Sequence, residues 1–103
     1  MDDLRINLAI AKFEYPDATL YESNTKDSVR IYNNYPKYII RNYCSNWSDI
    51  GPIIEREKID VTVNESGNGW EANTFFFESK TTAETPTKAA ALCYLRFKEI
   101  YYI

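Results

Sequence analysis

Tyrosines and basic residues are interleaved over residues 26–43, and their side chains suit recognition chemistry. They are Lys26, Arg30, Tyr32, Tyr35, Lys37, Tyr38, Arg41 and Tyr43. Tyrosine rings bury a large area at a small entropic cost, which favours contact with another protein. Basic groups between aromatic rings could instead hold phosphates while the rings stack on nucleic-acid bases. A third interpretation is that the rings line a sheet edge and loop, with their hydroxyls in water.

The overall charge makes nucleic acid the less favoured partner. The chain has 103 residues, with 12 basic and 15 acidic side chains and a net charge of -3. Long-range repulsion weakens the binding of phosphates by an acidic protein. Trp47, beside an expected helix start, is a further candidate anchor. The candidate protein-binding residues are Tyr32, Tyr35, Lys37, Tyr38, Arg41 and Trp47.

Acidic residues between positions 49 and 84 form a second constellation. The candidate acidic face comprises Glu55, Glu57, Asp60 and Glu71. Such a face could occupy a basic channel in a host enzyme, whereas an ordinary solvated face is the competing interpretation. Basic residues interrupt the set, and the sequence alone does not distinguish a catalytic pair of carboxylates from any other two glutamates. The spacing therefore does not predict carboxylate catalysis.

The residues that usually carry catalysis are scarce. Histidine is absent, which excludes a Ser-His-Asp triad, a Cys-His pair and a histidine metal site. Cys44 and Cys93 are too few for a four-thiolate metal site, and Cys44 has no base partner. We expect no catalytic residue, no cofactor and no metal, and hence not an enzyme.

The same sequence predicts a cytoplasmic protein. No run approaches the roughly 18–20 apolar residues that a membrane span requires. The first residues, Met1-Asp2-Asp3, lack the cationic start of a signal peptide. Without an export signal, the two cysteines are expected to be buried, reduced thiols.

Local patterns predict how the first half of the chain folds. A helix is expected over residues 3–14, capped by an aspartate, ended by Pro16 and apolar on two sides. Strands are expected over residues 19–23 and 28–32, joined by a polar hairpin turn. Val29 and Ile31 would face the core, whereas residues 33–36 break the regular structure.

The second half predicts a helix, a hairpin and a final helix. The first of these begins near Asn46 or Ser48 and ends at about Lys58. Strict alternation over residues 59–64 predicts a strand, which a glycine-rich loop connects to a partner strand over about residues 70–77. Thr85 and Pro86 predict the cap and first position of the last helix.

Three stretches carry a family resemblance. They are Asn42-Tyr43-Cys44-Ser45-Asn46-Trp47-Ser48-Asp49-Ile50-Gly51-Pro52-Ile53-Ile54-Glu55, then Trp70-Glu71-Ala72 after Gly67-Asn68-Gly69, and Thr85-Pro86 followed by Ala89-Ala90-Ala91 and Leu95. In these stretches the chain resembles the NinX-like group of small phage proteins and the related phage α/β/α (ABA) sandwich domain. The resemblance implies a phage or prophage gene and an antiparallel sheet with helices on both faces. It implies no activity, because the group has none settled.

Together these patterns predict a single α+β domain over residues 1–103. We expect a four-stranded antiparallel sheet with three helices, in the order α-β-β-α-β-β-α, arranged as an α/β/α sandwich. The expected function is non-enzymatic, stoichiometric binding of a host protein or protein complex, for example to inhibit a defence system such as CRISPR. The alternative is a nucleic-acid-binding accessory factor that uses residues 26–43. The terminal Tyr101-Tyr102-Ile103 would either cover the sheet or close a dimer interface.

Overall fold

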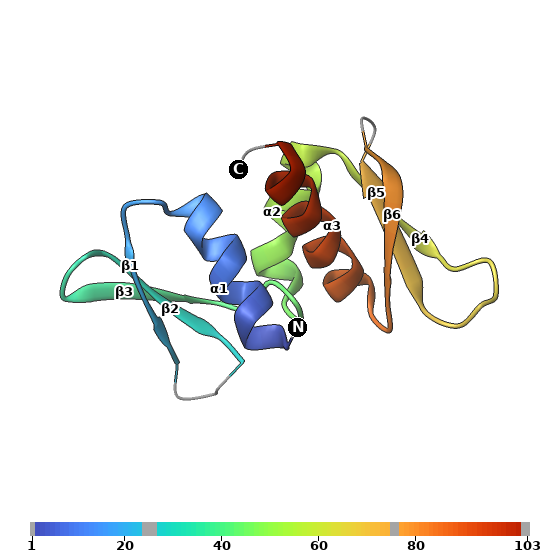
Figure 1. The fold of residues 1–103 in the computed structure, drawn as a ribbon. Helices are drawn as coiled ribbons and strands as arrows, with labels where there is room; N and C mark the ends of the chain where they lie inside the picture. Colours follow the sequence, from blue (N-terminus) through green and yellow to red (C-terminus); the bar gives the residue numbers. More distant parts are fainter. Residues whose placement is uncertain (1, 24–26, 75–76, 102–103) are drawn as a thin grey trace.

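Three helices and two three-stranded antiparallel sheets make up the computed structural model, which describes residues 2–23, 27–74 and 77–101 (Figure 1). The elements are α1 (Asp3–Glu14), β1 (Thr19–Glu22), β2 (Val29–Asn34), β3 (Lys37–Arg41), α2 (Trp47–Glu57), β4 (Ile59–Val63), β5 (Trp70–Thr74), β6 (Phe77–Ala83) and α3 (Pro86–Tyr101). Strands β1-β2-β3 form sheet A, and strands β4-β5-β6 form sheet B.

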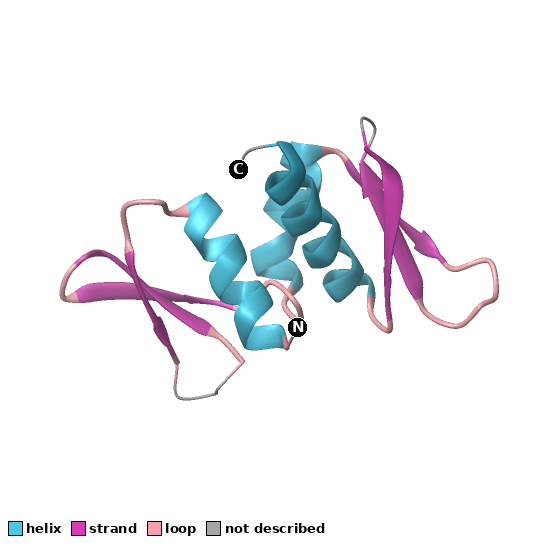
Figure 2. Cartoon of the chain, viewed as in Figure 1, coloured by secondary structure: helices cyan, strands magenta, loops and turns pink. Residues whose placement is uncertain are grey.

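The helices lie between the two sheets (Figure 2). Helix α1 contacts β1 and β2 on one side and α3 on the other, and α3 contacts all three strands of sheet B. The α+β class is confirmed, but the single four-stranded sheet is wrong. The predicted layer order is also reversed, because each sheet covers the helix layer with its own apolar face.

The structure also contains two strands that the sequence did not predict. β3 follows the Tyr35–Pro36 turn, whose peptide bond is cis, and pairs with β2. β6 pairs with β5, and its buried position Thr81 is polar. Neither strand shows the alternation of apolar and polar residues that marks a half-buried strand. Each predicted hairpin therefore gains a local third strand. Residues 75 and 76, within the predicted partner strand, lie outside the described residues.

Side-chain caps fix the starts of α2 and α3. The carboxamide of Asn46 accepts the backbone N–H of Ser48 at 2.9 Å, and α2 begins between the two residues predicted for its start. The hydroxyl of Thr85 accepts the backbone N–H of Lys88 at 3.3 Å, and Pro86 is the first residue of α3. Such caps satisfy N–H groups that have no partner within the helix.

The core lies on both sides of α1, as its two apolar stripes predict. Ile6 and Ile10, on one stripe of this helix, and Ala11, on the other, are fully buried. Val29 and Ile31 of β2 are buried as well, so the predicted inward face of that strand is confirmed.

Helix α3 is buried on more than one side because it lies between sheet B and the other two helices. Its buried side chains include Ala89, Ala90, Ala91, Cys93, Tyr94 and Leu95. The three alanines allow close approach of the neighbouring elements.

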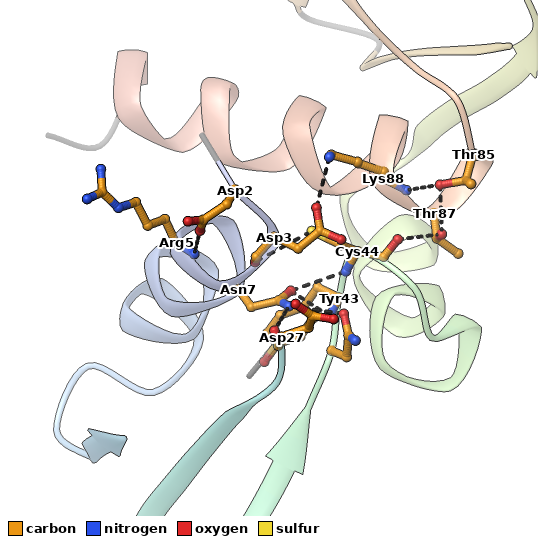
Figure 3. A network of polar contacts seen from close by, with 11 residues as sticks. Asp2, Asp3, Arg5, Asn7, Asp27, Tyr43, Cys44, Thr85, Thr87 and Lys88 are labelled. Carbon is orange, nitrogen blue, oxygen red and sulfur yellow. Dashed lines mark hydrogen bonds and ion pairs between the residues drawn. The ribbon is translucent and has the colours of Figure 1, made fainter. Parts of the chain in front are cut away.

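A buried asparagine connects α1 to one end of sheet A, where β2 begins and β3 ends (Figure 3). The Asn7 carboxamide donates to the backbone carbonyl of Asp27 at 2.6 Å and to the side chain of Asn42 at 3.0 Å. Its oxygen accepts the backbone N–H groups of Tyr43 at 2.8 Å and Cys44 at 3.2 Å. One fully buried side chain thus satisfies backbone groups before β2 and after β3.

Helix α3 holds the same loop from the other side (Figure 3). The Thr87 hydroxyl donates to the carbonyl of Cys44 at 2.7 Å. The Lys88 ammonium lies 2.8 Å from the carboxylate of Asp3 in α1. The Thr87 contact connects the loop after β3 to α3, and the Lys88 contact joins α3 to α1.

A charged junction connects the three helices. The Glu14 carboxylate accepts two hydrogen bonds from Arg56, at 2.9 and 2.7 Å, and one from the Tyr94 hydroxyl. Arg56 also donates to Glu57 at 2.8 Å. Burial alone would raise the pKa of Glu14, but the hydrogen bonds from Arg56 and Tyr94 outweigh it, and the pKa is lowered.

Candidate protein-binding site

The outer face of sheet A, which points away from the helices, is aromatic. In β2 the inward residues are Val29 and Ile31, so Arg30 and Tyr32 point outward. The strand register pairs Arg30 with Tyr21 of β1 on one side and with Ile40 of β3 on the other. Residues directly opposite in paired strands share a face, so these side chains lie together.

Four tyrosine rings form a continuous cluster on this face. The Tyr32 ring lies at its centre, with ring centroids 5.7 Å from Tyr21, 5.5 Å from Tyr35 and 5.2 Å from Tyr38. The Arg30 guanidinium lies 4.8 Å from the centroid of Tyr38 and donates to the Tyr32 hydroxyl at 3.1 Å. We call these five residues the tyrosine face. Aromatic contacts and a cation–π contact order its side chains before any partner arrives.

The tyrosine face is open to solvent. Tyr35 is 81% exposed, Tyr21 56% and Tyr38 49%, and the neighbouring Ile40 is also 49% exposed. A hollow of 360 Å³ lies beside Tyr21, Tyr32 and Tyr35. Grouped exposed rings of this kind are characteristic of interaction sites, whereas single exposed apolar residues are ordinary.

The outer face of sheet B shows that an outward sheet face in this protein need not be aromatic. Ile59, Ala72 and Thr81 point toward the helices, and the residues between them point outward. The outward side chains are Asp60, Thr62, Glu71, Asn73, Lys80 and Thr82. These are polar or charged, so the outer face of sheet B, over the side chains that the structure describes, lacks the aromatic character of sheet A.

The remaining predicted binding residues lie away from the ring cluster. Lys37 and Arg41 alternate with Tyr38 and therefore point to the other side of β3. The Arg41 guanidinium lies 3.6 Å from the carboxylate of Asp49 in α2. Trp47 begins α2 and is 56% exposed. Tyr43, the last tyrosine of the predicted segment, is buried.

The structure also adds a residue that the sequence reasoning missed. Tyr21 belongs to the face, although it lies outside the predicted segment 26–43. The signal was present, because the predicted hairpin between residues 19–23 and 28–32 places Tyr21 near Arg30 in a paired register. Lys26 of that segment lies outside the described residues.

One comparison with known proteins found a match. A family model described as bacteriophage P22, NinX matches residues 1–98. The chain belongs to this family. The match confirms the resemblance inferred from residues 42–55 and from the later stretches, and it extends to the N-terminal half. Neither the curated proteins nor the solved structures gave a match.

In this NinX-family protein the predicted acidic residues belong to different parts of the surface. They are Glu55, Glu57, Asp60 and Glu71. The first two lie in α2, where Glu57 is 2.8 Å from Arg56. Asp60 and Glu71 lie on the outer face of sheet B, where Glu71 is 3.3 Å from Lys80. Two of the four carboxylates are therefore already paired with basic groups of the same chain.

The thiols of this NinX-family protein are free and buried, as predicted. Burial raises the pKa of Cys44 to about 12 and that of Cys93 to about 11. The thiolate is the nucleophilic form, so neither side chain is activated. Over residues 2–23, 27–74 and 77–101, no three cysteine or acidic side chains could together hold a metal ion. No helix of the described chain has the length and apolar character to cross a membrane.

Proposed function

We propose that this phage-family protein is a binding protein that captures a host protein on the tyrosine face. The observation that carries the proposal is the cluster of four contacting, solvent-exposed tyrosine rings on the outer face of sheet A. Tyrosine and arginine are enriched among the residues that dominate binding energy at protein interfaces. Their ordered side chains reduce the entropy lost on association.

The proposed action is stoichiometric and takes place in the cytoplasm of the bacterial host. A chain that offers a recognition face and no activated thiol would act by occupying a surface of its partner. Inhibition of a host defence system, such as CRISPR interference, is the form of this action that we propose for a phage product. The polar side chains described on the outer face of sheet B favour the outer face of sheet A as the binding face.

Capture from a host lysate tests the proposal. The tagged wild-type protein is compared with a triple variant, Tyr21→Ser, Tyr35→Ser and Tyr38→Ser, and captured proteins are identified by mass spectrometry. We expect a single host protein at equal stoichiometry with the wild type. The variant should lose it, because about 2 kcal/mol or more per anchoring ring is removed.

The matched control carries three exposed substitutions on sheet B, Thr62→Ala, Asn73→Ala and Thr82→Ala, and should retain the partner. A separate Trp47→Ser variant establishes whether the start of α2 belongs to the same interface. Circular dichroism confirms that each variant is folded. Equal capture by the wild type and the folded tyrosine variant contradicts the proposal.

Single-stranded nucleic acid is the second candidate partner. It is favoured by the Arg30 guanidinium among stackable rings on one sheet face, and opposed by the net charge of -3. Fluorescence anisotropy with a labelled oligonucleotide at several salt concentrations tests it. Affinity that falls steeply with salt supports this candidate, whereas no binding at low salt eliminates it.

A further inference from the structure

Strand β3 is an edge of sheet A, and among the described strands it pairs with β2 alone. Residues 37–40 of β3 are exposed and Arg41 is half-buried. In an antiparallel pair, every second residue of an edge strand directs its N–H and C=O groups away from the partner strand. Such groups form a template on which another strand can pair.

An apolar groove lies directly beside this edge. It has a volume of 220 Å³ and is lined by Tyr15, by Ile31, Asn33 and Asn34 of β2, and by Lys37, Tyr38 and Ile39 of β3. Ile39 is 37% exposed, whereas its partner Ile31 in the register is buried. An added strand would place one of its side chains in the groove opposite Ile39.

The charges along β3 specify the chemistry of the added strand. Lys37, Ile39 and Arg41 share the side of β3 that faces the groove, with the two cations at its ends. The Arg41 guanidinium already forms an ion pair with the carboxylate of Asp49, at 3.6 Å. In the described part of the chain, no carboxylate comes within 4.0 Å of the Lys37 ammonium. Lys37 is therefore the stronger attractor for an acidic side chain.

The same charges argue against a second copy of this chain as the occupant. Two copies related by a twofold axis would pair their β3 edges antiparallel. With Ile39 opposite Ile39, that pairing sets Lys37 against the partner's Arg41, and like charges directly opposite destabilise paired strands. An acidic segment of another protein has no such conflict.

We propose that β3 accepts an extended segment of a partner protein as a fourth, antiparallel strand of sheet A. The segment carries an aliphatic residue opposite Ile39, in the groove, and acidic residues two positions away on either side. Backbone hydrogen bonds to the edge provide affinity, and the groove and Lys37 provide selectivity. This inference rests on the proposed function, because it states what kind of segment the captured host protein contributes.

A synthetic peptide tests this inference directly. Its core reads glutamate, threonine, valine, threonine, glutamate, and it carries a fluorophore at the end of a glycine–serine linker. Fluorescence anisotropy measures its affinity for the whole protein, and amide hydrogen exchange reports on residues 37–41. We expect binding that slows exchange in β3. Two further peptides are methylated at alternate backbone nitrogens, one at the odd and one at the even positions. One of the two should bind about tenfold more weakly, because only alternate N–H groups of an added strand donate to β3.

Charge reversal provides the matched comparison. Lys37→Glu should lower the affinity for the glutamate peptide at least about fivefold and raise the affinity for a peptide that has lysines in place of the glutamates. Arg96→Glu makes the same charge change at an exposed position of α3 and should leave the affinity unchanged. Strand addition is overturned if the wild-type protein binds the glutamate and lysine peptides equally well, or if N-methylation at neither set of positions weakens binding.

The outcomes separate this inference from the proposed function. If no peptide binds but the tyrosine variant still loses its host partner, strand addition fails and the proposed function stands. If the protein instead forms a dimer in which residues 37–41 are protected from hydrogen exchange, a second copy occupies the edge and the acidic segment is the wrong occupant. If the peptide binds as expected and the tyrosine variant retains its host partner, the tyrosine face fails while the edge site stands.

Discussion

Replacing Asn7 with alanine should strongly destabilise the protein. The side chain is fully buried and satisfies the N–H groups of Tyr43 and Cys44 and the carbonyl of Asp27. A buried backbone group that loses its partner costs roughly 1–3 kcal/mol. With three such groups, and water entering part of the space left by the carboxamide, we expect a loss of about 4 kcal/mol in the free energy of unfolding.

Urea unfolding followed by circular dichroism measures this loss, and it should appear as a lower midpoint with an unchanged slope. Asn73→Ala, at an exposed position of β5, is the matched control and should change stability by less than about 0.5 kcal/mol. Hydrogen exchange should show the largest loss of protection at the ends of β2 and β3. A loss below about 1 kcal/mol for Asn7→Ala would refute the reasoning, because solvent would then replace the carboxamide at little cost.

Three further predictions concern other parts of the molecule. Glu14→Gln should lower stability by about 2 kcal/mol at neutral pH, since charged hydrogen bonds are lost. Because the pKa of Glu14 is lowered in the folded state, this stability difference is present at a pH above 4.5, the ordinary pKa of the group, and should vanish as the pH falls through the lowered pKa. Urea titrations at several pH values measure it. Cys44 should react with a thiol reagent only on unfolding, because its pKa is raised to about 12; rapid labelling of the native protein at pH 8 contradicts this. Gly69→Ala should destabilise the protein by about 2 kcal/mol, because φ is +105° and the new Cβ would lie 2.8 Å from the carbonyl oxygen of Ala83. Gly51→Ala in α2 should stabilise it by about 0.5–1 kcal/mol, because a Cβ there would meet nothing within 4 Å; thermal melts of both variants test the contrast.

Elements defined by local signals were predictable from the sequence. Thr85 and Pro86 fixed the start of α3, Asn46 fixed the start of α2, and the alternation after Lys58 identified β4. These signals act within a few residues, so they do not depend on the tertiary fold. The layer order was not predictable in this way. It depends on which helix each hairpin packs against, and the periodicity of a strand does not identify its long-range partner.

The candidate site was predictable to the extent that it lies along one segment. Tyr32, Tyr35 and Tyr38 are close in sequence, and the structure brings their rings into contact. Tyr21 joins them only through the β1–β2 register, which a one-residue slip would have changed. Trp47 is separated from them because the Asn7-bound loop redirects the chain from sheet A into the helix layer before α2 begins.

The central position of the helices keeps the outer faces of the two sheets apart. The protein's longest dimension is 45 Å, and the exterior surfaces of the two sheets look in opposite directions from the helical middle. The side chains described at the two ends therefore differ in chemistry, with tyrosine rings on the exterior of sheet A and carboxylate, amide and hydroxyl groups on that of sheet B.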